Sequence, residues 1–518
     1  MAEQWVETGS PRVPLDPEGD VPREFEIALL PRDASIVDGD LVPKDFAYPM
    51  IAAAVAAAIG DTAVALAGLV SACLATVAVG WLTWELVRSK LAAAGSCLLA
   101  QTSVAWWAAS FGGFGFALSG IAFGVASIAV LVRFRGRRAP LPSVLGDPFV
   151  LAGLLGGLAC GFHYGSTPWW GGLLAGAALG NERSIRAASL TASKVAGAAA
   201  VALVPVLVFN AFVYGSPTDT GYSTFGTVLT AIDWQGGSVG FSWVALERNI
   251  SVYLLRPEVV PVVVILCWAP QALRARGLLP AGRQLVVVAI GAVALVAATG
   301  SSTLWGTDSF ETNASFLRYL APVFAVAFAL CGVVLSHLRD RAAALPAAEF
   351  ASLQRWIEPI GRWSVAGVWM LVVVLNAHTV WWGSNGQNQT SQSVAGLGDT
   401  QLAYLREVPE DAFVVSRRLD KVLYPERRIL VAAYLNTTTE RSDEPIHLYD
   451  TFPSVERVAA VADALADQGF FIVNDTQWLT PDEVSLLASM LSDGGRCLED
   501  VADLVMYEVV SCPDEETP

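Results

Sequence analysis

The chain carries little charge and very little lysine. Of its 518 residues 15% are charged, and the 32 basic residues include only four lysines (Lys44, Lys90, Lys194 and Lys421). A formal net charge of −16 repels a polyanion, so nucleic acid is excluded as an expected partner. An acidic, lysine-poor composition favours solubility in concentrated salt, and we therefore expect a halophilic archaeon as the source.

Signatures of nucleotide and metal chemistry are also missing from the sequence. It contains no GxGxxG segment and no phosphate-binding P-loop, and its four histidines are scattered rather than spaced as metal ligands. We therefore expect no metal and no cofactor.

Long apolar runs, by contrast, are abundant. Hydrophobic residues make up 54% of the chain, and a helix needs about 20 of them in succession to cross a bilayer. The segments that reach or approach this length are 62–87, 91–109, 111–132, 147–163, 167–181, 193–214, 253–273, 284–300, 316–338 and 363–382. The sequence therefore predicts a polytopic α-helical membrane protein with about ten spans.

Basic residues set the expected orientation of these spans. They fall in every second connection, for example at Arg88, in the run RFRGRR at 133–138, and between Arg339 and Arg362. Connections rich in arginine and lysine face the cytoplasm. The other connections and the polar tail are then expected outside, in a multi-pass protein of the plasma membrane.

The polar segment at 1–44 should then lie outside as well. It has no apolar core and no cleavage site of a signal peptide. The stretch YPMIAAAVAAAIG at 48–60 is too short to span, and we expect it to form an external juxtamembrane helix. Either the following span carries the segment across, or a first transmembrane helix is missing from this sequence.

The polar tail reads as a separate domain. Short apolar runs (DAFVVS, RRILVAAYL, GFFIVND and LVMYEVVS) alternate with two helical segments (SVERVAAVADALADQ and PDEVSLLASMLS), which predicts an α/β fold. A capping box is expected at Thr480 and Glu483. Cys497 and Cys512 flank the last strand, where a disulfide is one possibility. The expected domains are thus a loop and juxtamembrane helix (1–61), a transmembrane domain (62–382) and an extracytoplasmic α/β domain (383–518).

A polar turn follows the sixth span, in FNAFVYGSPTDTGYS at 209–223. Gly215 and Pro217 should end the helix, and a well-capped loop would look the same. The order of residues resembles the "(F/Y)GSP..TGY" turn of membrane glycosyltransferases of the GT-C class, especially relatives of glycosyltransferase family 39 and the protein O-mannosyltransferases. DGDLVPKDFAYPMIAAAVAAAIGD at 38–61 and SFLRYLAPVFAVAFAL at 315–330 are similar to two further stretches of that family.

The resemblance implies an activity. Such enzymes move a sugar, here a hexose, from a polyprenyl phosphate to an acceptor at the outer membrane face. The implied partners are a polyprenyl-phosphate sugar donor, with dolichyl phosphate as the carrier in an archaeon, a glycan, lipid or protein acceptor, and membrane lipids. Family members begin with a helix and an acidic pair that precede a loop similar to EQWVETGSPRVP at 3–14, which favours a missing first helix here.

This chemistry requires a base, a cation for the phosphate and an apolar groove for the isoprenoid tail. For the cation we favour Arg318, with Lys44 second, although an arginine at this depth also snorkels to the interface. His163 occupies a position where relatives carry arginine; a structural histidine would serve equally.

The base is harder to assign, since the family's acidic pair would lie upstream of Met1. The weak candidates on this chain are Asp38, Asp40 and Asp45. Residues expected to contact the sugar or the lipid carrier are Asn210, Tyr222 and Tyr319.

Two other classes of function stay open. A transporter would also have many helices, but no internal repeat is visible and no acidic residue lies near the centre of a predicted span. A catalytically inactive GT-C-like scaffold or acceptor-binding protein is the stronger alternative, because the family's acidic pair is not in this sequence.

Overall fold

The structure of the chain is a computed structural model. It describes residues 5–6, 8–14, 19–23, 25–29, 34–38, 40–43, 47–103, 106, 116–134, 147–163, 167, 170–172, 174, 185–220, 243, 246–247, 250, 259–277, 317–343, 351–382, 401–417, 423, 427–435, 453–474, 477–501 and 504–513.

The chain divides into two compact units. The helical unit comprises Phe46–Phe209 and Gly237–Gln389, and the α/β unit comprises Met1–Asp45, Asn210–Gly236 and Thr390–Pro518. Segments far apart in sequence therefore share one unit. The three-part division expected from composition separates membrane-spanning residues from external ones, whereas these two units are defined by contacts within the fold. The three-part division stays a prediction.

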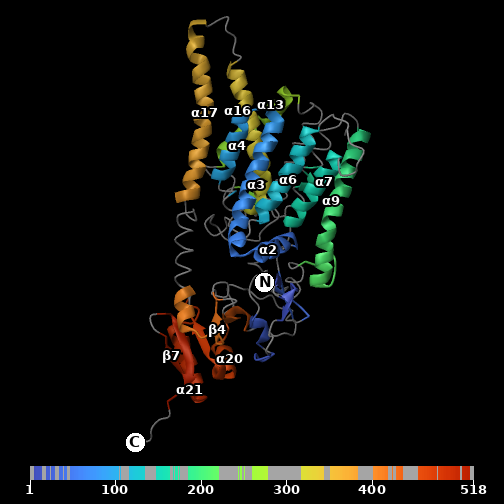
Figure 1. The fold of residues 1–518 in the computed structure, drawn as a ribbon. Helices are drawn as coiled ribbons and strands as arrows, with labels where there is room; N and C mark the ends of the chain where they lie inside the picture. Colours follow the sequence, from blue (N-terminus) through green and yellow to red (C-terminus); the bar gives the residue numbers. More distant parts are fainter. Residues whose placement is uncertain are drawn as a thin grey trace. The chain divides into compact units, whose positions relative to one another are not determined.

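Helices make up most of the described part of the helical unit (Figure 1). They are α2 (Ala47–Ile59), α3 (Asp61–Val87), α4 (Lys90–Thr102), α6 (Phe116–Arg133), α7 (Pro148–Phe162), α9 (Ile185–Tyr214), α12 (Val260–Leu266), α13 (Ala269–Ala275), α16 (Leu317–Ala343) and α17 (Ala351–Trp382). The helix at 48–60 is confirmed as α2. The expected helix at 253–273 is instead two short helices, and each begins with a proline at its first or second position. The predicted span 284–300 and most of 167–181 lie outside the described residues.

Several of these helices are suited to a bilayer. Among the described residues, three stretches are long and apolar enough to cross one: Leu66–Val87, Ser189–Tyr214 and Ala321–Arg341. Shorter apolar helical stretches are Ala47–Ile59, Ala117–Arg133, Pro148–Phe162, Val260–Ala275 and Trp369–Trp382. Together these helices make the chain a multi-pass membrane protein.

Glycine lies where these helices approach most closely. A Cβ atom added to Gly157 of α7 would lie 2.4 Å from the carbonyl oxygen of Ala199 in α9. A Cβ atom on Gly332 of α16 would lie 2.4 Å from Oγ of Ser96 in α4. Small residues allow helix backbones to approach in this way, which is typical of packing within membranes.

A five-stranded sheet forms the centre of the α/β unit. Its strand order is β5-β4-β6-β8-β7, with β4 (Phe413–Ser416), β5 (Arg428–Val431), β6 (Phe470–Val473), β7 (Arg496–Asp500) and β8 (Met506–Ser511). Strands β5, β4 and β6 are parallel, and β8 and β7 are added antiparallel. Helices α20 (Val455–Leu465) and α21 (Pro481–Asp493) accompany the sheet, and residues 401–407 are helical as well.

The expected features of this tail are largely confirmed. Four of the five strands and helices α20 and α21 lie where the sequence predicted them, and β7 was missed. Thr480 and Glu483 form the capping box, and Cys497 and Cys512 form a disulfide.

The segment before residue 45 completes the α/β unit. It forms a small antiparallel sheet of order β1-β3-β2, with β1 (Val13–Pro14), β2 (Ala34–Val37) and β3 (Asp40–Pro43), and a 3₁₀ turn η1 (Glu26–Leu29). Val21 and Phe25 are buried in the same apolar core as Phe413 and Phe470 of the tail. Asp20 accepts a hydrogen bond from Arg428 at 2.8 Å. No pattern in the sequence predicts this long-range packing.

Candidate functional site

The hairpin formed by β2 and β3 presents two of the predicted carboxylates. Asp38 lies in its turn with a positive φ of 55°, a conformation that aspartate tolerates better than most residues. The Asp38 side chain is 81% exposed, and that of Asp40 is 33% exposed. Both carboxylates are therefore accessible from outside the hairpin.

Arg12 of the preceding segment links this hairpin to the end of α9. Its Nη1 lies 3.6 Å from Oδ2 of Asp38 and 3.8 Å from Oδ2 of Asp40. Its Nε donates a hydrogen bond to the carbonyl oxygen of Val213 at 3.1 Å. The Arg12 side chain is 22% exposed, so a single, mostly buried cation holds two carboxylates and a helix end together.

A second bond fixes the other end of the hairpin. The buried Tyr214, in the last turn of α9, donates its hydroxyl hydrogen to the carbonyl oxygen of Pro43 at 2.7 Å. The stretches at 38–43 and 210–217, which carried the resemblance to the GT-C enzymes, are therefore neighbours in the α/β unit. Their proximity joins two motifs separated by more than one hundred and fifty residues, as the 171-residue separation of this hydrogen bond shows.

The residues of the polar turn after α9 form hydrogen bonds with one another. Gly215 takes a positive φ of 81°, which ends the helix as the sequence predicted. Asn210 is 3% exposed, and its side-chain amide donates to the carbonyl oxygen of Pro217 at 3.4 Å. The hydroxyl groups of Ser216 and Thr218 lie 3.1 Å apart. At least one hydrogen-bonding group of Asn210 is thus used within the turn. A contact between Asn210 and a sugar or carrier stays a prediction.

An apolar cavity of about 420 Å³ lies in the helical unit between α2, α3, α6 and α7. Aromatic side chains of Trp81, Phe123 and Phe162 contribute to its wall. Its two serines, Ser71 and Ser119, lie 2.8 Å apart and form a hydrogen bond with each other. The wall is suited to a hydrocarbon chain, the kind of groove that an isoprenoid tail requires.

Helix α2 is attached firmly beside this cavity. The ring of Tyr48 lies 5.5 Å from that of Phe162, centroid to centroid, and its hydroxyl group donates to the carbonyl oxygen of Ala202 in α9. A Cβ atom at Gly161 would lie 2.3 Å from the Tyr48 ring, so only glycine fits here. The apolar run at 48–60 predicted the helix but not this contact, because a lone tyrosine in such a run has no distinctive pattern.

The phosphate-binding candidates are less fully described. His163 follows α7 directly, as its C-terminal cap, and is 2% exposed. Arg318 and Tyr319 lie in the first turn of α16, and the structure describes their backbone only. Lys44, Asp45 and Tyr222 lie outside the described residues. In the described part of the chain no cluster of histidine, cysteine and acidic residues is suited to a metal.

Arg12 is the residue of this site that the sequence analysis missed. It stands inside the stretch EQWVETGSPRVP, but an arginine before a short strand has no distinctive pattern. Its contacts with Asp38, Asp40 and Val213 single it out.

The chain is similar in fold to two crystal structures of ArnT from Cupriavidus metallidurans. The match to ArnT in the apo state covers 98% of this chain and 95% of that chain, with 16% identity and a TM-score of 0.54. The match to ArnT bound to undecaprenyl phosphate covers 99% and 96%, with 15% identity and a TM-score of 0.55. The chain therefore has the fold of a GT-C membrane protein.

Other comparisons add less. The Archaeoglobus fulgidus oligosaccharyltransferase, in complex with zinc and sulfate, matches with 12% identity and a TM-score of 0.43, over 99% of this chain and 69% of that one. That match is too distant to support an argument. No family model matches the chain, and no curated protein matches it in sequence.

Proposed function

We propose that this protein is a membrane glycosyltransferase that moves a sugar from a polyprenyl-phosphate carrier to an acceptor at the outer membrane face. The observation that carries the proposal is the fold match to ArnT bound to undecaprenyl phosphate, which extends over 99% of this chain. Fold alone does not define an activity. Further support comes from the contacts that bring the family-like stretches at 38–43 and 210–217 together.

The transfer step assigns roles to the carboxylates of the hairpin and to Arg318. A carboxylate of the hairpin, from Asp38 or Asp40, takes the proton of the acceptor hydroxyl group as its oxygen attacks the anomeric carbon. The bond between that carbon and the phosphate oxygen breaks, and the polyprenyl phosphate leaves with the electron pair. Arg318 stabilises the charge that develops on the phosphate.

The cavity beside α2 supplies the remaining requirement. Its apolar wall would hold part of the isoprenoid tail, and His163, at the end of α7, would lie near the phosphate as a second donor. Dolichyl phosphate as the carrier, a hexose as the sugar, and an extracytoplasmic α/β domain on the plasma membrane belong to the same proposal. The acceptor is a glycan, a lipid or a protein.

Carrier binding gives the first test. Undecaprenyl phosphate and dolichyl phosphate are titrated into the full chain in detergent, and bound lipid is counted by native mass spectrometry. The variant Arg318→Gln should weaken binding about tenfold or more, because it removes a charge-assisted hydrogen bond to the phosphate. Arg341→Gln is the matched control at the opposite end of the same helix; equal loss in both variants contradicts the assignment.

Transfer is tested next, with radiolabelled dolichyl-phosphate mannose as donor and a native membrane extract as acceptor. Loss of the base should lower the rate about 10²- to 10⁴-fold while carrier binding persists, so Asp38→Asn and Asp40→Asn are compared. Asp20→Asn is the control, since Asp20 pairs with Arg428 in the same unit. Carrier binding without any transfer by the unaltered chain would favour the inactive scaffold.

A further inference from the structure

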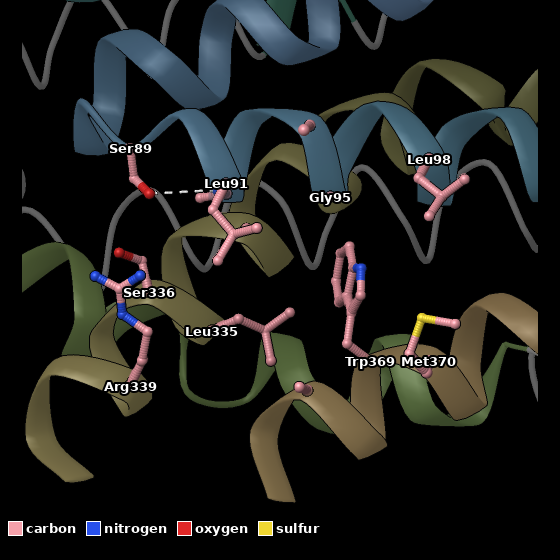
Figure 2. A pocket seen from close by; sticks show the side chains of 13 residues that line it. Ser89, Leu91, Gly95, Leu98, Leu335, Ser336, Arg339, Trp369 and Met370 are labelled. Carbon is pink, nitrogen blue, oxygen red and sulfur yellow. Dashed lines mark hydrogen bonds between the residues drawn. The ribbon is translucent and has the colours of Figure 1, made fainter. Parts of the chain in front are cut away.

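A second apolar pocket, of about 400 Å³, lies between α4, α16 and α17. Figure 2 shows Trp369 of α17 pointing toward Gly95 of α4, with Leu98 and Met370 on one side and Leu91 and Leu335 on the other. A Cβ atom at Gly95 would lie 3.0 Å from the indole ring, so the glycine makes room for the tryptophan. None of these helices except α16 contributes to the candidates of the proposed site.

One end of this pocket is polar and cationic. Ser89, Ser336 and Arg339 lie together there, away from Leu98 and Met370 (Figure 2). Ser89 is the N-cap of α4, so the partial positive charge of that helix end adds to the charge of Arg339. The lining is otherwise apolar, which gives the pocket the polarity of an amphiphile with an anionic head.

The positive charge at this end exceeds the negative charge among the described residues. Asp340 is the acidic neighbour, and its Oδ2 lies 2.6 Å from Nη2 of Arg276. Its other oxygen lies 3.6 Å from Nη2 of Arg339. Ser336 is also held by Arg276, at 3.0 Å. One carboxylate is thus shared between two arginines, and Arg339, whose side chain is 46% exposed, has donors left for an anion.

The apolar wall is open to its surroundings. Leu91 is 69% exposed, Met370 is 53% exposed and Leu98 is 45% exposed. In a helix of a membrane protein such a surface faces hydrocarbon, so a lipid chain can enter from the side. A volume near the lower limit for ligand pockets, about 300 Å³, suits one hydrocarbon chain rather than a whole lipid.

We infer that this pocket binds an anionic membrane phospholipid, with its phosphate at Arg339 and one acyl chain along Leu91, Trp369 and Met370. The lipid fills the groove between α4, α16 and α17 and neutralises the excess positive charge at its end. This site is separate from sugar transfer and does not depend on the proposed function.

The test uses the full chain in detergent, with dioleoyl phosphatidylglycerol and dioleoyl phosphatidylcholine as probes in native mass spectrometry. Phosphatidylglycerol should bind with one-to-one stoichiometry and about tenfold more tightly than phosphatidylcholine. The variant Arg339→Gln should remove that preference. Arg341→Gln, two residues further along α16 and absent from the pocket wall, should keep it.

The apolar half of the site is tested by filling the groove. Leu98→Trp should abolish retention of either lipid, and Met370→Trp provides a second such variant if the first does not yield a monodisperse protein. Equal affinity for the two lipids, an unchanged preference in Arg339→Gln, or normal binding in both tryptophan variants would overturn the inference. So would displacement of phosphatidylglycerol by an equimolar amount of undecaprenyl phosphate, which would make the isoprenoid carrier the occupant.

Discussion

In the helical unit several glycines lie where two helices approach closely, whereas in the α/β unit Phe413 and Phe470 fill one apolar core and Phe471 lies in a second one. The large apolar side chains of the helical unit are often exposed: Leu69 of α3 is 61% exposed and Val208 of α9 is 63% exposed. Phe413 and Phe470 of the sheet are fully buried, at 0%. The difference follows from the two solvents.

Water drives large apolar groups into a core, at about 25 cal/mol for each Å² of apolar surface buried. Hydrocarbon supplies no such force between helices, so close backbone approach and van der Waals contact must hold them together. Leucine and valine side chains on the outside of the helical unit can therefore face hydrocarbon, while others of the same types, such as Val79 and Leu82, are buried between its helices. Substitutions that change side-chain volume should separate the two kinds of packing.

The largest effect is expected in the core of the α/β unit. Phe470→Ala should lower the free energy of unfolding by about 3–5 kcal/mol, because it removes a fully buried ring and leaves a cavity. Pulse proteolysis of the full chain in urea measures this loss. Leu486→Ala, on the exposed face of α21, should change stability by less than about 0.5 kcal/mol; similar losses in both variants would contradict a water-driven core.

The second-largest loss of stability is expected on removal of the disulfide. Cys497 and Cys512 are 15 residues apart, and closing a loop of that length stabilises a fold by about 3 kcal/mol through the unfolded chain. The double variant Cys497→Ser with Cys512→Ser should lose about that amount in the same assay. Reduction of the unaltered chain with dithiothreitol should reproduce the loss, and a reduced chain as stable as the oxidised one would refute the estimate.

In the helical unit, a larger side chain at a close contact between helices should destabilise the fold, as a smaller side chain does in the core of the α/β unit. Gly157→Leu forces α7 away from α9, because its Cβ would lie 2.4 Å from the Ala199 carbonyl oxygen. We expect a loss of about 1–3 kcal/mol, seen as a lower melting temperature in fluorescence-detected size-exclusion chromatography. Gly197→Leu is the matched control in α9, since no atom lies within 4 Å of its added Cβ. If both variants melt alike, the close-contact argument fails.

The smallest effect concerns the capping box. Hydrogen bonds from the backbone N–H and the hydroxyl group of Thr480 lower the pKa of Glu483 below its ordinary value of 4.5. A lowered folded-state pKa gives stability that is fully present above pH 4.5 and is lost as the pH falls through the folded value. At this exposed site the change should be about 0.5 kcal/mol.

The neutral variant isolates that contribution. Glu483→Gln keeps a capping-box side chain but has no charge to titrate. Its unfolding free energy, measured by urea titration between pH 3 and pH 7 (chosen to bracket roughly the carboxyl range), should lack the part of the acid loss that Glu483 causes. Identical acid profiles for the variant and the unaltered chain would show that this carboxylate does not contribute.

Local signals predicted much of this fold. The apolar runs marked α3, α9 and α16 by length alone, and the capping box at Thr480 was readable because its partners are three residues apart. Strand β7 was not readable, since Arg496, Glu499 and Asp500 interrupt its apolar alternation. The break at 267–268 had a signal that was overlooked, the prolines at 261 and 270.

Long-range contacts limit how much of the candidate site could be predicted from the sequence. The turn at 215–217 and the hairpin at 38–43 each carried a recognisable pattern, but the hydrogen bond from Tyr214 to Pro43 that joins them did not. Arg12 is invisible for the same reason: its role comes from a contact with Val213, 201 residues away. Periodicity describes neighbours along one element and contains no information on which elements meet.

The packing of Phe25 against the tail also has a consequence for biosynthesis, because the two parts of this core are synthesised at different times. Asp20 and Arg428 are 408 residues apart, and ribosomes add about 5–20 residues per second, so roughly 20–80 s separate the appearance of the two partners. During that interval Val21 and Phe25 have no core to enter, although the finished fold leaves them only 6% and 1% exposed. We therefore expect this segment to be prone to aggregation during synthesis, and any pause in translation before Arg428 lengthens that interval.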